Sequence, residues 1–211
     1  MQLTKYKHSC VRLDDGDRTL VIDPGMFSDL DAALDGADAV LVTHEHADHL
    51  QPDRLRAAAR AEPRLQIWAP APVAASLADL GEQVLTVEPQ QTFQAAGFTV
   101  RTFGGQHAVI HPIIPVIANV GYLVDEAVYH PGDSLIVPPV PVETLLLPVS
   151  APWSKVAEVI DFAISVRAPR AYPIHDAIVA DIYHSLLAGT LVPIAAQFGV
   201  EVGTWDSPVE V

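Results

Sequence analysis

The segment from Val40 to His49 constrains this chain more than any other, because an apolar run leads directly into a group of metal-binding side chains. The run ends at Thr43, and His44, His46, Asp48 and His49 follow within six residues. Imidazole and carboxylate groups are the ligands that Zn²⁺ and similar divalent ions prefer. Gathering four of them at a strand end costs stability unless a metal ion offsets their desolvation. The segment therefore predicts a metal site.

Composition limits the classes of protein to which the chain can belong. A length of 211 residues suffices for one domain with a substantial core, and we expect a single domain over residues 1–211. Half of the residues are hydrophobic, which argues against disorder. With 26 acidic and 12 basic residues, the net charge is −14. An acidic surface repels phosphate backbones, so we expect no nucleic-acid partner.

Cysteine usage and hydropathy indicate the compartment. Cys10 is the only cysteine, so an intrachain disulfide is impossible, as is usual in a reducing environment. Met1 to Lys7 lacks a signal pattern, and the longest apolar stretch, Ala108 to Val124, is interrupted by two prolines. We therefore expect a cytoplasmic protein with no membrane partner.

Short strands and helices alternate along the chain. Two mixed sheets packed face to face, with helices outside, fit this order. The expected helices are Leu30–Leu34, Pro52–Ala61, Pro72–Leu80 closed by Gly81, Ser154–Val166 capped by Ser154, and Asp181–Phe198 with a break at Gly189 and Pro193. The expected strands are Leu3–Lys7, Cys10–Leu13, Thr19–Ile22, Ala39–Thr43, Leu65–Trp68, Val84–Val87, a hairpin within Gln91–Phe103, Val120–Val124, Ala127–Tyr129, Thr144–Leu147, Arg170–Ile174 and Glu201–Trp205.

Three further candidate ligands each follow a predicted strand. His107 comes after the hairpin, Asp133 after Ala127–Tyr129, and His175 after Arg170–Ile174. Strands that end at the same edge of a sheet would bring these groups to the early histidines, and loops on a rigid scaffold are where functional groups usually lie.

The number of ligands suffices for two ions. One ion would take His44, His46 and His107, and the other would take Asp48, His49 and His175, with Asp133 between them. Each ion would keep an open position for water, and a shared hydroxide would be the nucleophile. The site would be net positive and would favour an anionic substrate or a developing oxyanion.

This pattern resembles the metallo-β-lactamase superfamily, whose hallmark is His-x-His-x-Asp-His followed by a distant His, Asp and His. The hallmark stands here as residues 44–49, and the later members are His107 in Gly-Gly-Gln-His, Asp133 in His-Pro-Gly-Asp-Ser and His175 in Tyr-Pro-Ile-His-Asp. His8-Ser9 and Ile22-Asp23-Pro24-Gly25 are similar to the small metal-dependent hydrolase branch that contains the ascorbate-phosphate lactonase. The resemblance implies an α/β fold, a four-layer αββα sandwich with the site at the sheet edges.

We therefore expect a dinuclear hydrolase of a small ester, lactone or phosphoester that uses a metal-bound hydroxide, with Asp48 orienting the nucleophile. Zn²⁺ is the expected ion, and Mn²⁺ suits the same ligands. The alternatives are a ribonuclease or phosphodiesterase, a diiron redox enzyme, and a metal-holding scaffold without turnover. His46 stands where related oxygen-reducing proteins carry a carboxylate, which favours zinc.

The sequence leaves several roles open. Either His107 or His111 could be the third ligand of the first ion. His107 is favoured because it is closer to the strand end, and His111 would then line the pocket. His8 and His130 fit a place near the ligands as well as a purely structural role. Asp48 could instead cap the following helix. The apolar run at 113–117 fits a lid, a dimer surface or a buried loop, so a homo-oligomer is compatible with the sequence. Met26, Phe27 and Trp153 are expected in the core.

Overall fold

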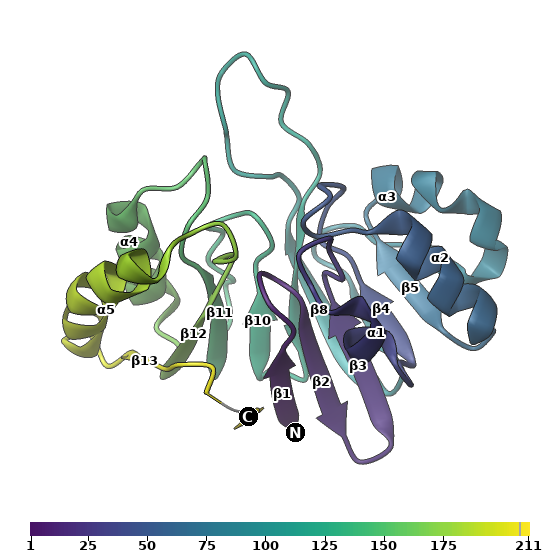
Figure 1. The fold of residues 1–211 in the computed structure, drawn as a ribbon, viewed down its shortest axis with the longest axis horizontal. Helices are drawn as coiled ribbons and strands as arrows, with labels where there is room; N and C mark the ends of the chain where they lie inside the picture. The colour runs from purple at the N-terminus through teal and green to yellow at the C-terminus, as the bar shows by residue number, and fades with distance from the viewer. Residues whose placement is uncertain (207) are drawn as a thin grey trace.

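The computed structural model describes residues 1–206 and 208–211. Two sheets of seven strands face each other, and helices cover both outer faces (Figure 1). The expected four-layer αββα sandwich is confirmed.

The first sheet combines the strands up to residue 86 with the last strand of the chain. Strands β3 to β6 run parallel, while β1, β2 and β3 pair antiparallel, so β1 points the same way as β3 and β4. In spatial order the strands are β14 (Val209–Glu210), β1 (Gln2–Lys5), β2 (Val11–Asp15), β3 (Arg18–Ile22), β4 (Ala39–Leu41), β5 (Gln66–Ala69) and β6 (Val84–Thr86).

The second sheet carries the C-terminal half. Strands β10 to β13 run parallel, and β8, β9 and β10 pair antiparallel, so β8 points the same way as β10 and β12. In spatial order the strands are β13 (Glu201–Val202), β12 (Arg170–Ile174), β11 (Thr144–Pro148), β10 (Val128–His130), β9 (Val120–Val124), β8 (Phe98–Gly104) and β7 (Thr92–Ala95).

Alternating side chains along the strands build three apolar layers. In β3, Leu20 and Ile22 face the second sheet, whereas Val21 faces the outer helices. Tyr122 of β9 and Leu41 of β4 belong to the central layer between the sheets. This period-two pattern is what a strand covered on both faces requires.

The helices lie on the two outer faces. Helices α1 (Leu30–Leu34), α2 (Pro52–Ala61) and α3 (Ala71–Ser76) cover the first sheet, and α4 (Val156–Val166) and α5 (Asp181–Ala196) cover the second (Figure 1). Helix α2 begins with Pro52, which is compatible with the first helical turn because its missing N–H has no partner there.

Three helix predictions are wrong in detail. The expected helix at 72–80 ends at Ser76, and a 3₁₀ turn over Ala78–Gln83 follows. Ser154 does not cap α4, because its hydroxyl accepts a hydrogen bond from the amide of Ala151, and Lys155 is the N-cap. Helix α5 continues through Pro193 without a break. Pro193 lies near the helix end, where water can hydrate the carbonyl group that it leaves free.

The chain ends differ from the sequence expectation as well. The C-terminal strand is only Glu201–Val202, and the unpredicted β14 pairs with β1. A strand of two residues carries too little periodicity to be found in a sequence. Within the described ranges, every helix is too short or too polar to cross a membrane.

Candidate metal centre

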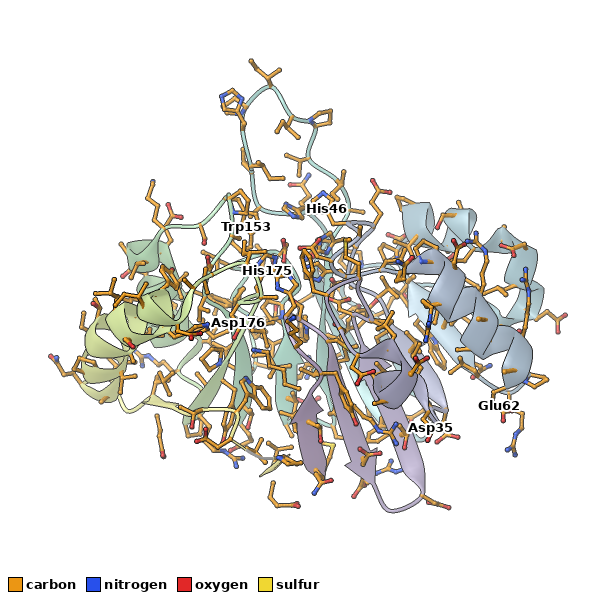
Figure 2. The ribbon with its side chains drawn as sticks, viewed as in Figure 1. Asp35, His46, Glu62, Trp153, His175 and Asp176 are labelled. Carbon is orange, nitrogen blue, oxygen red and sulfur yellow. The ribbon has the colours of Figure 1, made fainter. Side chains whose placement is uncertain are left out.

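Strand direction brings the candidate ligands to one edge of the sandwich. Strands β1 and β4 of the first sheet end there, as do β8, β10 and β12 of the second. The polar residues that follow these strands are His8, the segment 44–49, His107, Asp133 and His175. These residues therefore meet at one edge, as their positions after strand ends predicted, and Figure 2 shows His46 and His175 near this edge.

Hydrogen bonds join the two sheets at this edge. The amide of Val120 donates to the carbonyl of Thr43 at 3.0 Å, and the Tyr122 hydroxyl donates to the carbonyl of Val42 at 2.9 Å. The amide of His175 donates to the carbonyl of His8 at 3.1 Å. These bonds fix the ligands of the first sheet relative to those of the second.

The first group comprises His44, His46, His107 and Asp133, each offering one atom within 4.8 Å of the others. Nε2 of His44 lies 3.1 Å from Nδ1 of His46, and Nε2 of His107 lies 3.3 Å from Oδ2 of Asp133. Two ligands of a tetrahedral zinc ion with bonds of 2.0–2.1 Å are about 3.3–3.4 Å apart. The separations therefore suit a shared ion.

The second group comprises His8, Asp48, His49 and His175. Nε2 of His175 lies 3.4 Å from Oδ2 of Asp48, and Nε2 of His49 lies 3.9 Å from the same oxygen. Asp48 does not cap α2, whose N-cap is Gln51. Its carboxylate faces His175 and His49 instead.

Asp133 lies between the two groups. Its Oδ2 is 3.2 Å from Nε2 of His175 and 3.3 Å from Nε2 of His107, while its Oδ1 is 3.0 Å from Nε2 of His49. Trp153 donates a hydrogen bond from Nε1 to Oδ2 at 2.9 Å. The carboxylate is thus placed where one residue can reach an ion in either group.

The outer nitrogens of four histidines are held by protein acceptors. Nδ1 of His49 donates to Asp23, Nδ1 of His107 to the carbonyl of Ala108, and Nδ1 of His175 to the carbonyl of Ser150, each at 2.6 Å. Nδ1 of His44 lies 2.9 Å from the Thr43 hydroxyl, which must accept because its own proton goes to Asp23. This tautomer directs each Nε2 lone pair inward, as in known metal sites.

The inward atoms are poorly satisfied without an ion. Nε2 of His49, His107 and His175 and Oδ1 of Asp133 are buried, and within the described residues they make no hydrogen bond of acceptable geometry. Buried polar atoms are normally paired, so such a cluster needs an explanation. The donor set, imidazole nitrogen and carboxylate oxygen, fits divalent ions such as Zn²⁺ or Mn²⁺.

His8 differs from the other members of its group. Its Nδ1 accepts a hydrogen bond from the amide of Ala177 at 3.2 Å, so its proton is on Nε2, which donates to Asp48 at 3.1 Å. A protonated nitrogen cannot bind a metal. We therefore expect His8 to orient the Asp48 carboxylate rather than to be a ligand.

The other two uncertain histidines lie outside both groups. His111 is exposed in the loop between β8 and β9, whereas His107 is buried beside Asp133. His130 is buried, and its Nε2 donates to the carbonyl of Ser9 at 2.9 Å while its Nδ1 accepts from Gly132. His130 thus connects the end of β10 to the turn that holds His8.

Burial and carboxylates shift the titration of the site in opposite directions. Burial lowers the pKa of His44 well below its ordinary value and lowers that of His46 as well. Burial would also lower the pKa of His175, but the carboxylates of Asp133 and Asp48 outweigh this effect and raise the pKa of His175 to about 9. Burial would raise the pKa of Asp48, yet hydrogen bonds from His175 and His8 lower it. Asp48 is therefore ionised at neutral pH.

Two residues that contribute to the site were not predicted to do so from the sequence. Asp23 is fully buried and accepts hydrogen bonds from His49 and Thr43. The only sequence signal for this role is its position after a strand, in the segment Ile22-Asp23-Pro24-Gly25. Trp153, expected in the core, is half-buried, and its indole N–H donates to Asp133. Figure 2 shows Trp153 near His175. Met26, also expected in the core, is 54% exposed, and Phe27 packs edge-on against His8.

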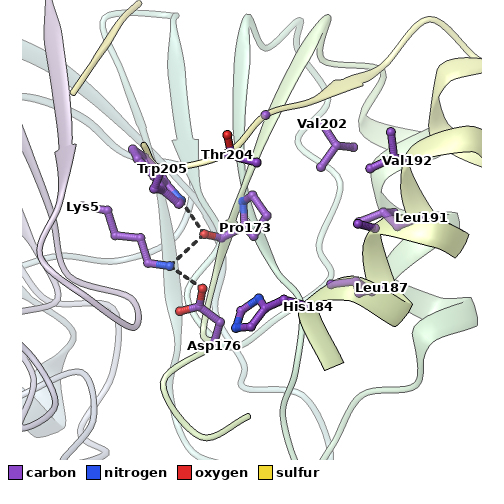
Figure 3. Close-up of a pocket in the computed structure, with 12 residues that line it drawn as sticks. Lys5, Pro173, Asp176, His184, Leu187, Leu191, Val192, Val202, Thr204 and Trp205 are labelled. Atoms are coloured by element: carbon purple, nitrogen blue, oxygen red, sulfur yellow. Dashed lines mark hydrogen bonds and ion pairs between the residues drawn. The ribbon is translucent and has the colours of Figure 1, made fainter. Parts of the chain in front are cut away.

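A cavity of about 250 Å³ lies between β12 and α5, and no member of the two ligand groups lines it (Figure 3). Nζ of Lys5 donates to Oδ2 of Asp176 at 2.6 Å and to the carbonyl of Pro173 at 3.1 Å, and Trp205 also donates to that carbonyl. Burial lowers the pKa of Lys5. The ion pair joins the end of β1 to Asp176, the residue after His175. It therefore helps to hold the end of β12 in position.

Comparison with known proteins agrees with this geometry. A family model described as a beta-lactamase superfamily domain matches residues 2–175. The chain belongs to the beta-lactamase superfamily. This confirms the family that the motifs resemble; the lactonase branch within it stays a prediction.

Relatives with similar sequences align with either most of the chain or only a part of it. Protein Rv0786c of Mycobacterium tuberculosis is 41% identical over 196 residues, which are 90% of this chain and 91% of that protein. A UPF0173 metal-dependent hydrolase of Geobacillus thermodenitrificans is 39% identical over 54 residues, 24% of each chain. The expected class, a metal-dependent hydrolase, is confirmed at this level.

Solved structures share the fold. Igni18, a metallo hydrolase from Ignicoccus hospitalis, has a TM-score of 0.74 at 20% identity, covering 99% of this chain and 97% of its own. CmlA, a diiron beta-hydroxylase from Streptomyces venezuelae, has a TM-score of 0.73 at 18% identity, covering 100% of this chain and 54% of its own. The same fold thus occurs with different chemistry, so the substrate must be argued from the site.

Proposed function

We propose that this protein is a dinuclear metal-dependent hydrolase of a small ester, lactone or phosphoester. The observation that carries the proposal is the orientation of four histidines, whose outer nitrogens are bound to protein acceptors and whose inner nitrogens converge on Asp133. Such an arrangement would hold one ion with His44, His46 and His107 and another with Asp48, His49 and His175, with Asp133 reaching both.

Two divalent ions in these positions would supply Lewis acidity and lower the pKa of a water molecule. Asp48, ionised and 25% exposed at the mouth of the site, would accept a hydrogen bond from that water and orient it. As the water oxygen attacks, Asp48 would take the proton that the water releases and then pass it to the leaving group. His8 would hold the carboxylate in place through its Nε2 proton.

The net charge of the protein and the charge of the ions favour different classes of substrate. The net charge of −14 disfavours RNA, and a salt-sensitive affinity for RNA would revive the ribonuclease alternative. The positive ions would favour a developing oxyanion, and the expectation of an anionic substrate rests on them alone. A diiron redox enzyme, the remaining alternative, would contain two irons and absorb visible light.

The test combines metal content with hydrolysis. The zinc-loaded protein should contain two equivalents of metal by mass spectrometry and should hydrolyse at least one member of a panel of esters, lactones and phosphodiesters, with activity abolished by chelator. His107→Ala and Asp133→Ala should lose metal and hydrolysis together. His111→Ala is the matched control and should keep both ions. Full metal content and full turnover in His107→Ala or Asp133→Ala would contradict the assignment.

A further inference from the structure

A small cavity opens directly beside the candidate ligands His46 and His107. Its volume is about 220 Å³, and its remaining walls include Ile110, Ile114, Pro115 and Val116 from the loop between β8 and β9. This loop rises above the rest of the molecule, as the teal segment at the top of Figure 1 shows. Pockets for drug-sized ligands measure roughly 300–1,000 Å³, so this one suits a short chain or a single ring.

Main-chain hydrogen bonds hold the base of the loop against the site. The amide of His107 donates to the carbonyl of Ile117 at 3.0 Å, and the amide of Ala108 donates to the carbonyl of Asp133 at 2.8 Å. Within the loop, the amide of Ile114 donates to the carbonyl of His111 at 2.9 Å. The apolar walls are therefore positioned relative to two candidate ligands before any substrate arrives.

The charge of the loop limits what the cavity can bind. The sequence from Thr102 to Val124 contains no lysine, arginine, aspartate or glutamate. Nothing in this wall would pair with a phosphate or carboxylate group located away from the ions. Burial of an apolar group, by contrast, is favourable, and each buried methylene strengthens binding about fourfold.

We propose that this cavity binds an apolar substituent of the substrate, so that the preferred substrate is an uncharged ester or lactone with a short alkyl chain or a single ring next to the scissile bond. The inference rests on the proposed hydrolase function and narrows it. Phosphoesters become the disfavoured class. Ile114 becomes a residue that determines specificity.

Two adjacent isoleucines provide a matched pair for the test. Ile114 lines the cavity and is 48% exposed, whereas Ile113 is 85% exposed and does not line it. Ile→Ala at either position removes the same atoms from the same loop. A difference between the two variants therefore reports the cavity rather than the loop in general.

The experiment measures kcat/KM of the zinc-loaded protein on p-nitrophenyl acetate, butyrate and hexanoate. The wild type should prefer hexanoate. Ile114→Ala should lower the hexanoate-to-acetate ratio roughly fourfold, the factor that corresponds to about one methylene of lost burial, because Ile114 is only one of several residues that line the cavity. Ile113→Ala should leave that ratio and the metal content unchanged. Saturation-transfer NMR with 1-hexanol and with ethanol adds a binding readout that needs no turnover; hexanol should bind the wild type and Ile113→Ala more strongly than Ile114→Ala.

The outcomes separate this inference from the proposed function. Ester hydrolysis with equal chain-length ratios in both variants would overturn the inference and leave the function standing. Hexanol binding that depends on Ile114, without hydrolysis of any substrate, would support the apolar site and refute the function. A wild type that turns over phosphodiesters faster than every ester would overturn the substrate class.

Discussion

Nδ1 of His49 lies 2.6 Å from Oδ2 of Asp23, and both side chains are fully buried. The same carboxylate accepts hydrogen bonds from the amide and the hydroxyl of Thr43, each at 2.7 Å, and that hydroxyl accepts from Nδ1 of His44. A single carboxylate therefore orients one histidine in each candidate ligand group. Partners of this kind set the tautomer and basicity of a metal ligand.

Asp23→Asn should lower metal affinity about 10–100-fold, because the amide NH₂ would face groups that also donate. Competition with a chromophoric chelator measures this change. Asp38→Asn is the control, since Oδ2 of Asp38 also accepts a main-chain hydrogen bond, from Thr19 at 2.9 Å. Asp38 is exposed and lies at the opposite end of β4 from His44. Equal affinities for the two variants would show that Asp23 does not tune the site.

Metal binding should depend on pH through His175. Its pKa is raised to about 9 from 6.5, so the imidazolium stabilises the metal-free fold fully below pH 6.5, and this contribution is lost as the pH rises through about 9. Chelator-treated protein should therefore lose thermal stability over that interval. Metal affinity should rise over the same interval, because the ion must displace the proton. Differential scanning calorimetry and calorimetric titration test both, and a metal affinity that stays constant from pH 6.5 to 9 would refute the linkage.

Gly25→Ala should disrupt the segment that carries Asp48 and His49. A Cβ atom at Gly25 would meet the carbonyl of Asp48 and the amide of His49 at distances below 3.0 Å, where main chain cannot yield easily. We expect this variant to lose bound metal, measured by mass spectrometry. Gly189→Ala is the matched control, because the added methyl group meets nothing within 4 Å and alanine favours the helix. Metal retention by Gly25→Ala would show that the segment adapts.

Cys10 should be unreactive in the folded protein. Burial raises the pKa of its thiol, and the side chain is fully buried beneath the first sheet. The thiolate is the reactive form, so a disulfide reagent at pH 8 should modify no thiol in native protein and one thiol in denaturant. Rapid modification of the native protein would mean that this region opens readily.

The sequence was sufficient to predict which types of residue gather at this edge and in what order along the chain. Each candidate ligand follows an apolar strand within eight residues, and strand ends are visible in local periodicity. The choice of His107 over His111 followed from distance to the strand end, and the structure places only the former beside Asp133 among the described residues. Helix details were less predictable, because the cap at Lys155 and the continuous α5 depend on neighbouring contacts and solvent.

Only the tertiary structure decided which of these groups meet and which residues support them. Sequence alone determined that imidazoles and carboxylates would stand at strand ends, since alternation and apolar runs are local properties. The directions in which β1, β4, β8, β10 and β12 pair determined that those ends share one edge. Asp23 under His49, His8 on Asp48 and the apolar loop beside His107 all depend on contacts between distant parts of the chain, which local pattern does not encode.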